Sequence, residues 1–385
     1  MRVIIAPDSY KGSVSALEVA RAMQRGVQTV FPHAEIQLVP IADGGEGTVE
    51  AMVASTGGTV VKKSVQGPLG TSVEAYYGLL GDKVTAVIEM AAASGLPLVP
   101  KAQRDPRGTT TYGTGELIKA ALDAGAKRLV IGIGGSATND GGAGMLQALG
   151  VRFLDAAGQE LPPGGAALAK LASIDMSGLD ARLAQTDILV ACDVDNPLCG
   201  PRGASAVYGP QKGATPAIVQ ELDAALARYA RVAQEVTGKD AAEIAGAGAA
   251  GGLGAGFLFF TEGRLCPGVD VVLETANFEE MVKQADLVLT GEGCTDYQTA
   301  YGKAPVGVSA LARAYGVPCI CLSGGLGEGC SAVREKGIDA LSSTAPGPLS
   351  LEECMERGAE LIEEAAERVC RLLAVGMNLK NRQIA

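Results

Sequence analysis

The stretch Asp286–Pro305, with the sequence DLVLTGEGCTDYQTAYGKAP, predicts a strand, a polar loop and the start of a helix. Leu287–Leu289 is a short apolar run typical of a buried strand, which we expect to end at Gly291. Pro305 suits the first turn of a helix, where its missing N–H breaks no hydrogen bond. In a parallel α/β sheet the carboxyl ends of the strands are where ligands bind, so the loop is a candidate site.

The loop holds an unusual set of functional groups within a few residues. It contains two acids, two hydroxyls, an amide and an amine: Glu292, Asp296, Thr295, Thr299, Gln298 and Lys303. A threonine or aspartate before a helix is an ordinary N-cap. Capping explains Thr295 or Asp296, but it does not explain the amide and the lysine as well. We therefore favour a binding or catalytic role for the group.

Length and composition limit the class of protein. A chain of 385 residues should form two domains, because a single core rarely grows beyond about 250–300 residues. The 53 glycines are about twice the usual share of ~7%, which predicts many tight turns or close approaches of backbone to ligand. The net charge of −11 argues against a nucleic-acid or acidic-membrane partner, and it leaves a small-molecule substrate.

Cysteine and histidine usage narrows the chemistry further. The nine cysteines form no CxxC pair, and Cys319 and Cys321 lie in an apolar run where core packing is the better account. The single histidine, His33, disfavours a histidine-based zinc site and a Ser-His-Asp triad. Acid–base work should therefore fall to Asp, Glu or Lys. The amino-terminal apolar run is too short for a signal peptide, so we expect a cytoplasmic protein.

Strand and helix patterns alternate at both ends of the chain. Strands are predicted at 2–6, 35–41, 286–289, 318–322 and 340–343, and helices at 16–30, 48–55, 269–284, 305–315, 331–336 and 351–373. The middle differs, with strand patterns at 60–65, 73–79 and 84–90 that alternate as in antiparallel pairing. It continues with strands at 128–132, 151–155 and 187–191 and helices at 114–124, 145–149, 216–237 and 249–260.

This order predicts an α/β protein with a discontinuous domain. A doubly wound, Rossmann-like parallel sheet domain is expected from residues 1–60 and 266–385, and a large inserted α+β domain from 61–265. We expect the active site in the cleft between the two domains, a common location for ligand pockets.

The most distinctive motif is the glycine loop Gly132–Gly142, which follows a predicted strand and precedes a helix. Bare N–H groups in such a loop can hold phosphate, and the candidates are Gly134, Gly135, Ser136, Asn139 and Asp140. The loop also satisfies the loose pattern G-x-G-x-x-A, with Asp155 ending a later strand, which favours a dinucleotide-dependent dehydrogenase. There is no Walker A sequence, so a kinase would need a different phosphate site.

Other acids follow predicted strands. Asp193 and Asp195 suit Mg²⁺ binding or general-base work, and an Asx-turn before Pro197 explains them equally well. Asp8, Ser9 and Lys11 follow the first strand, and Asp43 and Glu46 follow the second. A single cleft at the strand ends could collect all of these groups.

Six motifs resemble the bacterial glycerate kinases of the glycerate 2-kinase type. They are IAPDSYKGS, ADGGEGT, GIGGSATNDGGAGMLQALG, ACDVDNPLCGPRGA, YGPQKGA and TGEGCTDYQTAYGKAP, and together they extend over nearly the whole chain. One departure is Cys294-Thr295, where the relatives are expected to carry Arg-Ile. The resemblance implies ATP-dependent phosphorylation of D-glycerate with Mg²⁺ and a two-domain architecture.

The resemblance and the chemistry of phosphoryl transfer together suggest roles. Asp193 is our first candidate for the base that accepts the glycerate hydroxyl proton, and Asp296 is the second. Lys11 and Lys303 would neutralise the substrate carboxylate and the transferred phosphoryl group, and Asp193 or Asp195 would hold Mg²⁺ with the ATP phosphates.

The physical reading leaves other functions open. An NAD-dependent hydroxy-acid dehydrogenase and a non-catalytic sugar-acid-binding protein are the alternatives in other classes. Phosphorylation at the C3 hydroxyl is the alternative within the kinase reading, because only the resemblance favours C2. The oligomeric state is also open, with a homodimer as the candidate assembly.

Overall fold

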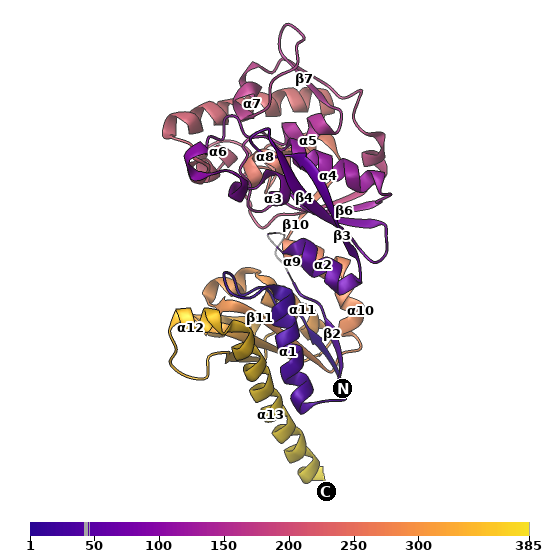
Figure 1. Cartoon of the computed structure of the whole chain (residues 1–385), viewed down its shortest axis with the longest axis vertical. Helices are drawn as coiled ribbons and strands as arrows, with labels where there is room; N and C mark the ends of the chain where they lie inside the picture. The colour runs from indigo at the N-terminus through magenta and orange to yellow at the C-terminus, as the bar shows by residue number, and fades with distance from the viewer. Residues whose placement is uncertain (42–44, 46, 385) are drawn as a thin grey trace. The chain divides into compact units, whose positions relative to one another are not determined.

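The computed structural model describes residues 1–41, 45 and 47–384 (Figure 1). The burial of side chains is described as far as residue 379. These residues fall into two compact units. Unit 1 takes its described residues from Met1–Asp43, Glu50–Ser55 and Val272–Ala385, and unit 2 from Gly44–Val49 and Thr56–Val271. Each unit has its own sheet, as expected for a chain of this length.

Unit 1 contains a five-stranded sheet in the order β13-β12-β11-β1-β2, in which every neighbouring pair is parallel. The strands are β1 Arg2–Ile5, β2 Glu35–Leu38, β11 Leu287–Thr295, β12 Cys319–Leu326 and β13 Ala340–Ser343. The predicted parallel α/β architecture of this part of the chain is confirmed.

Helices cover both faces of the unit 1 sheet. Their bounds are α1 Ala16–Val30, α10 Phe278–Val282, η6 Tyr297–Tyr301, α11 Ala304–Ala314, η7 Cys330–Lys336, α12 Leu351–Glu356 and α13 Gly358–Ile384. Two more helices, α2 Thr48–Thr56 and α9 Gly268–Thr275, each include residues of both units. Val3, Ile5 and Leu289 pack with α1 and α13 on one face. Cys321 packs with Val333 on the opposite face, so the sheet is covered on both sides.

Helix α1 begins as its sequence predicts. The Ser15 hydroxyl accepts a hydrogen bond from the Glu18 N–H, and the Glu18 side chain accepts one from the Ser15 N–H. This reciprocal capping satisfies two N–H groups that the helix would otherwise leave unpaired. Val19, Met23 and Val27, one turn apart, are fully buried, which is the helical spacing seen in the sequence.

Unit 2 contains a six-stranded mixed sheet in the order β10-β9-β6-β5-β4-β3. The strands are β3 Thr59–Gln66, β4 Ser72–Leu79, β5 Thr85–Glu89, β6 Arg128–Gly132, β9 Asp187–Ala191 and β10 Arg264–Cys266. β3, β4 and β5 pair antiparallel, as predicted. From β5 onward the sheet is parallel through β6, β9 and β10, so it is a mixed α/β sheet and not antiparallel throughout.

The remaining elements of unit 2 pack against this sheet or extend from it. They are α3 Ala91–Ser94, η1 Leu96–Leu98, η2 Lys101–Gln103, α4 Tyr112–Asp123, α5 Ala143–Ala148, β7 Arg152–Leu154, η3 Gly165–Lys170, β8 Ser173–Asp175, η4 Ala181–Gln185, α6 Ala204–Tyr208, η5 Pro210–Lys212, α7 Pro216–Thr237 and α8 Ala249–Phe260. β7 pairs with β8 in a separate two-stranded sheet. No helix in the described part of the chain is long and apolar enough to cross a membrane.

Several predicted elements differ from the structure, including the helix predicted at 351–373, which is two helices, α12 Leu351–Glu356 and α13 Gly358–Ile384. β11 does not end at Gly291, because it stays in register with β12 through Glu292↔Ser323 as far as Thr295↔Leu326. The predicted helix 269–284 is two helices, α9 and α10, separated by Asn277 with a left-handed φ of 54°. The helix predicted at 249–260 is interrupted at 250–252, where three consecutive residues have positive φ.

We predict that Gly26→Ala destabilises unit 1 by about 1–3 kcal/mol, the usual cost of overpacking. Alanine normally favours a helix interior over glycine. At Gly26, however, an added Cβ would lie 2.3 Å from the Glu363 carbonyl oxygen and 2.7 Å from the Ala366 Cβ, where α1 packs against α13. Urea unfolding measures the change.

The matched control is Gly376→Ala in α13, where an added Cβ meets nothing within 4 Å. That variant should be more stable than the wild type by about 0.5–1 kcal/mol. If both substitutions stabilise the protein, the close packing of α1 on α13 is wrong.

Candidate functional site

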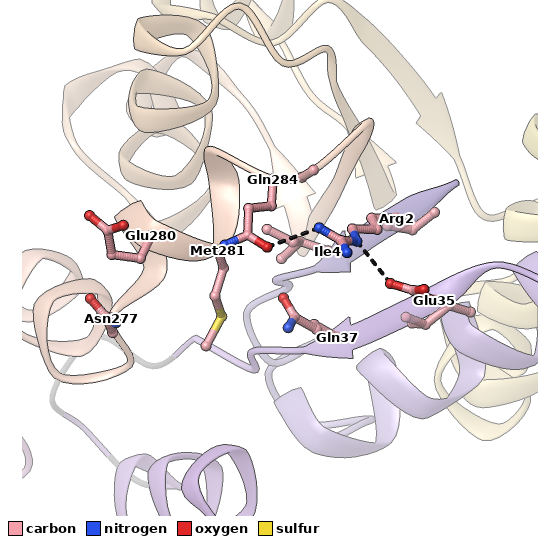
Figure 2. Close-up of a pocket in the computed structure, with 11 residues that line it drawn as sticks. Arg2, Ile4, Glu35, Gln37, Asn277, Glu280, Met281 and Gln284 are labelled. Atoms are coloured by element: carbon pink, nitrogen blue, oxygen red, sulfur yellow. Dashed lines mark hydrogen bonds and ion pairs between the residues drawn. The ribbon is translucent and has the colours of Figure 1, made fainter.

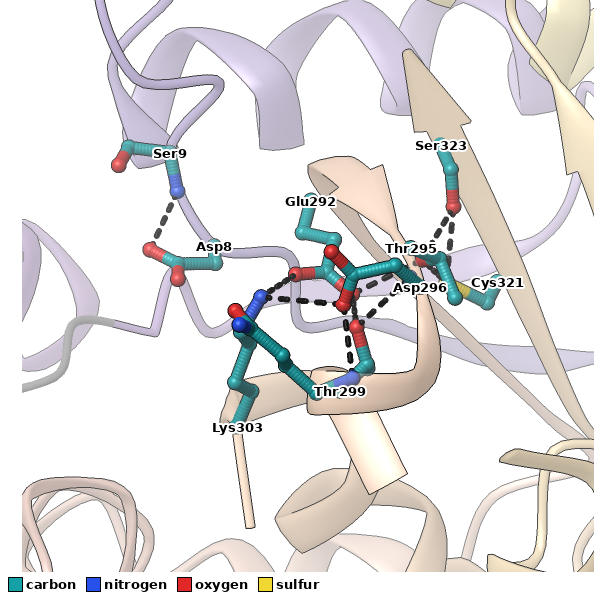
Figure 3. Close-up of polar contacts among 10 residues, drawn as sticks. Asp8, Ser9, Glu292, Thr295, Asp296, Thr299, Lys303, Cys321 and Ser323 are labelled. Atoms are coloured by element: carbon teal, nitrogen blue, oxygen red, sulfur yellow. Dashed lines mark hydrogen bonds and ion pairs between the residues drawn. The ribbon is translucent and has the colours of Figure 1, made fainter. Parts of the chain in front are cut away.

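A buried glutamate is the centre of the polar group in unit 1 (Figure 3). Glu292 lies in β11 with 5% of its surface exposed. Its Oε1 accepts hydrogen bonds from the hydroxyls of Thr295 at 2.8 Å and Thr299 at 2.7 Å. The Thr295 hydroxyl also lies 2.7 Å from that of Ser323 on β12. The carboxylate is therefore fixed in orientation by two neighbouring segments of the chain.

The ammonium group of Lys303 lies close to the Glu292 carboxylate. Its Nζ is 3.8 Å from Glu292 Oε2 and 3.7 Å from Asp296 Oδ1. Burial raises the pKa of Glu292, against the two threonine hydroxyls and Lys303, which act to lower it. We call Glu292, Thr295, Asp296, Thr299, Lys303 and Ser323 the Glu292 cluster. It combines two carboxylates and one exposed ammonium group at the carboxyl end of a parallel sheet.

The local sequence explains how Asp296 and Lys303 reach their positions. Asp296 caps η6, because its carboxylate accepts the Gln298 N–H while the Thr299 hydroxyl accepts the Asp296 N–H. Gly302 then takes a left-handed φ of 104°, and Lys303 becomes the N-cap of α11. Asp296 is thus a capping residue and also an ion-pair partner of Lys303, so the two readings of this residue are compatible.

Gln298 does not join the Glu292 cluster through its side chain. The side chain is exposed, and its amide donates to the Tyr297 hydroxyl at 3.3 Å. The prediction that Gln298 binds substrate therefore has no supporting contact among the described residues, and it stays a prediction.

The loop after β1 lies beside the Glu292 cluster, as Figure 3 shows for Asp8 and Ser9. The Asp8 N–H donates to the Gly291 carbonyl at 2.8 Å, which continues the β1–β11 pairing beyond the strand. Asp8 Oδ1 accepts the Ser9 N–H at 2.6 Å, and Lys11 is exposed. Sequence analysis placed these residues at strand ends, and the parallel pairing brings the two loops together. Asp43 and Glu46 lie outside the described residues.

The glycine loop of unit 2 follows β6 and has an exposed and a buried half. Gly134 and Gly135 are exposed, whereas Asn139 and Asp140 are fully buried. The Asp140 carboxylate accepts hydrogen bonds from the N–H groups of Thr111, Gly142 and Gly144 and from the Thr111 hydroxyl. These contacts hold the loop to the start of α4 and α5. Asn139 Nδ2 donates to the Ser205 hydroxyl.

Lys212 is a member of this site that the residue-by-residue sequence analysis did not select. It ends η5 and is 2% exposed, and its Nζ lies 2.6 Å from both the Ser136 hydroxyl and the Thr138 carbonyl oxygen. Burial lowers the pKa of Lys212 to about 7, and Asp140 acts in the opposite direction. The quoted motif YGPQKGA contained the residue, but an isolated lysine carries no pattern that distinguishes a buried amine from a solvated one.

The structure contradicts the dinucleotide-binding interpretation. In a dinucleotide fold the acid lies at the end of a strand that pairs beside the one preceding the glycine loop. Here Asp155 follows β7, which pairs with β8 and not with β6. Its carboxylate accepts the N–H groups of Ala157 and Gln159 in a local turn. The match to G-x-G-x-x-A is therefore a coincidence in a glycine-rich chain.

Asp193 and Asp195 follow β9, the strand beside β6, so their loop leaves the same edge of the sheet as the glycine loop. Asp193 Oδ1 accepts the Gly268 N–H at the start of α9, at 2.8 Å. Asp195 forms an exposed ion pair with Arg202 at 2.8 Å. In the described part of the chain, no three His, Cys, Asp or Glu side chains gather as a metal cluster.

A separate cavity of about 390 Å³ lies in unit 1, over the start of β1 and β2 and beside α10 (Figure 2). Its polar lining is largely paired internally. Arg2 donates to Glu35 at 2.8 Å and to Gln284 at 2.9 Å. None of the predicted site residues lines this cavity, and we assign it no function.

Comparison with known proteins identifies the family. The sequence model of the glycerate kinase family matches residues 3–374. The chain belongs to the glycerate kinase family. A glycerate kinase of Halalkalibacterium halodurans is 54% identical over 367 residues, which cover 95% of this chain and 97% of that protein. Glycerate 2-kinase of Escherichia coli is 49% identical over 377 residues, covering 98% and 99%.

A solved structure agrees with this assignment. The crystal structure of a Salmonella typhimurium protein assigned as a glycerate kinase 2 has a TM-score of 0.91 and 51% sequence identity, covering 98% of this chain and 99% of that one. The family membership inferred from the sequence motifs is confirmed, and the protein is a kinase. The roles of individual residues in this glycerate kinase remain predictions.

We predict that Glu292→Gln is more stable than the wild type at neutral pH. A raised pKa in the folded state means that folding favours the protonated acid, so the wild type loses stability as pH rises through that pKa. The amide keeps an Oε1 acceptor for both threonine hydroxyls and carries no charge. Urea midpoints from about pH 4 to about pH 8 should show a gain that grows with pH.

The control is Glu328→Gln, which removes the charge of an exposed glutamate in the same unit. Its stability difference from the wild type should not grow in the same way. A Glu292→Gln variant that is less stable than the wild type at every pH would mean that the Lys303 interaction outweighs burial.

Proposed function

We propose that this kinase transfers the γ-phosphoryl group of ATP to the C2 hydroxyl of D-glycerate and forms 2-phosphoglycerate. The observation that carries the proposal is the full-length similarity to a protein named glycerate 2-kinase. The polar groups at the strand ends support it. Phosphoryl transfer requires mainly positioned charges and little covalent chemistry from the protein.

The electropositive groups of this reaction would be Lys11, Lys303 and the exposed half of the glycine loop. Lys303 already lies within 4 Å of two carboxylates, which restricts its ammonium group to a small volume. Gly134 and Gly135 are exposed and follow a strand, so their N–H groups could donate to phosphate oxygens. We propose that Lys11 and Lys303 neutralise the substrate carboxylate and the transferred phosphoryl group.

The general base would be an aspartate. Asp193 is our first choice, because it follows β9 at the carboxyl edge of the sheet and its Oδ1 is held by the Gly268 N–H at 2.8 Å. Asp296 is the second choice, and its Oδ1 lies 3.7 Å from Lys303 Nζ in the Glu292 cluster. With one histidine in the chain, an aspartate is the natural candidate for this role.

Mg²⁺ would be held mostly by the nucleotide. Magnesium in kinases commonly binds one or two carboxylates together with substrate phosphates. The Asp193 and Asp195 pair fits this pattern in its oxygen chemistry, although Asp195 would have to leave its exposed ion pair with Arg202. Exposed pairs of this kind contribute little to stability, so that exchange is inexpensive.

We further propose that the two units correspond to the domains 1–60 with 266–385 and 61–265. In each unit the candidate residues leave the carboxyl edge of the parallel strands.

The direct test is incubation with ATP, Mg²⁺ and D-glycerate. ADP should form only when all three are present, and excess EDTA should abolish turnover because ATP needs its metal ion. Purified enolase, added without phosphoglycerate mutase, should then convert the product to phosphoenolpyruvate as fast as ADP appears.

Two outcomes would change the proposal. ADP without phosphoenolpyruvate until mutase is added would show that C3 is the acceptor. NADH formed from glycerate without ATP would restore the dehydrogenase reading, which the separate position of β7 argues against.

We predict that Asp193→Asn lowers kcat by roughly 10²–10⁴, the range typical of losing a general base. The amide can still accept the Gly268 N–H, so the fold at the start of α9 should be kept. Asp155→Asn is the control, because its carboxylate serves only a local turn, and its kcat should equal that of the wild type. Normal turnover of Asp193→Asn together with a large loss in Asp296→Asn would assign the base to Asp296.

A further inference from the structure

Lys212 carries a buried amine that contacts the glycine loop, and among the described residues this amine forms no ion pair with an acid. The hydrogen bonds of its Nζ go to the Ser136 hydroxyl and the Thr138 carbonyl oxygen. An ammonium group has three N–H donors. The structure provides acceptors for two, so a charged Lys212 would lack one partner. A buried charge without a counter-ion is rare in proteins.

The backbone around Lys212 keeps the amine in this position. Pro210 starts η5, and Gly213 follows Lys212 with a left-handed φ of 99°. A Cβ at Gly213 would lie 2.2 Å from the Arg104 carbonyl oxygen, so only glycine allows the chain to turn here. The turn directs the lysine side chain toward the glycine loop and away from solvent.

Ser136 connects the amine to the surface. It is 7% exposed and follows the exposed Gly134 and Gly135. Because its oxygen accepts the Lys212 N–H, its own O–H is free to donate to a group outside the loop. An anionic oxygen at this position would accept from the Ser136 hydroxyl and would also feel the lysine charge behind it.

We propose that Lys212 is a positioning residue of the kinase reaction, which acts through Ser136 to hold an anionic oxygen of a substrate at the glycine loop. The proposal rests on the proposed function. The anionic oxygen belongs either to a phosphate of ATP or to the carboxylate of glycerate, and the experiment below separates the two.

The burial of Lys212 gives its proposed role a measurable consequence, which is proton uptake on binding. With a pKa of about 7, Lys212 is mostly neutral at pH 8, and a neutral amine has two N–H donors for its two acceptors. An anion at the loop favours the charged form, so binding should raise the pKa of Lys212 and take up a proton.

Other titratable groups lie around Lys212, and the experiment must distinguish their protons from the proton of Lys212. Asp140 on the glycine loop is buried and its pKa is raised. Arg104 donates to the carbonyl of Gln211, the residue before Lys212. Tyr208 at the end of α6 donates to Asn196, and burial raises its pKa. Tyr208 therefore keeps its proton near pH 8, and variants of Lys212 separate the proton of Lys212 from that of Asp140.

The experiment is calorimetric binding of Mg-ATP alone and of D-glycerate alone, at about pH 8, in two buffers with different heats of ionisation. Wild-type protein should take up close to one proton with one of the two ligands, and that ligand is the one held at the loop. For this ligand, Lys212→Met should abolish the uptake and weaken binding by roughly 10- to 100-fold. Ser136→Ala should reduce both effects, and adding Lys212→Met to it should weaken binding little further.

Lys239→Met is the matched control, because it removes another partly buried lysine that donates to a backbone carbonyl oxygen in unit 2. The Lys239→Met variant should bind both ligands with wild-type affinity and with the same proton uptake as the wild type. The wild-type measurement needs no variant, so a misfolded Lys212→Met protein would still leave the proposal testable through the wild type and Ser136→Ala. Absence of proton uptake with both ligands, or full uptake in Ser136→Ala, overturns the proposal. If the same wild-type preparation turns over glycerate, only this inference fails; if it does not, the proposed function fails.

Discussion

The parallel pairing of β1 with β11 is the constraint on which unit 1 depends. It aligns Val3 with Leu287 and Ile5 with Leu289, and the Asp8 N–H to Gly291 contact extends it beyond the strands. Because the strands are parallel, their carboxyl ends share one edge of the sheet. The acids after β1 and the Glu292 cluster therefore lie side by side although they come from opposite ends of the chain. Without this pairing, Asp8 and the loop after β1 would not lie beside the Glu292 cluster.

The two units use desolvation in the same way. Glu292 in unit 1 and Lys212 in unit 2 are both buried, and both form hydrogen bonds with hydroxyl groups. Burial favours the neutral form of each and shifts their pKa values in opposite directions. A charged ligand beside a buried group changes the balance between the charged and neutral forms of that group. Both side chains are thus sensitive to ligands in a way that exposed acids and lysines are not.

The sequence predicted the strands and the strand-end residues well, because hydrophobic periodicity is local. Asp187–Ala191, Pro216–Thr237 and Ala340–Ser343 have the predicted bounds. Prediction from the sequence failed where contacts between residues far apart in the chain determine the structure. β11 continues through Gly291 and Gly293 because β12 provides partners for them, and no local signal shows that partner. The dinucleotide pattern was misleading for the same reason, since strand pairing decides whether Asp155 can reach the loop.

Lys212 shows a further limit of sequence reasoning. Its burial depends on Gly213 passing close to the Arg104 carbonyl oxygen, a contact between segments more than a hundred residues apart. The high glycine content has the same origin in several places. A Cβ at Gly251 would lie 2.0 Å from the Thr138 carbonyl oxygen, and one at Gly165 would lie 2.2 Å from that of Asn139.

These glycines bring backbone against the back of the glycine loop, while Gly134 and Gly135 leave its front exposed. The composition predicted many tight turns or close approaches of backbone to ligand, and the contacts of Gly165 and Gly251 are close approaches of backbone to backbone that support the loop. A loop supported on one side by packed backbone and by Asp140 would lose little entropy on binding an anion on the other side, which is the role we propose for it. That rigidity is what a kinase without a Walker A sequence needs, because phosphoryl transfer depends on donors that are already in place when the phosphate arrives.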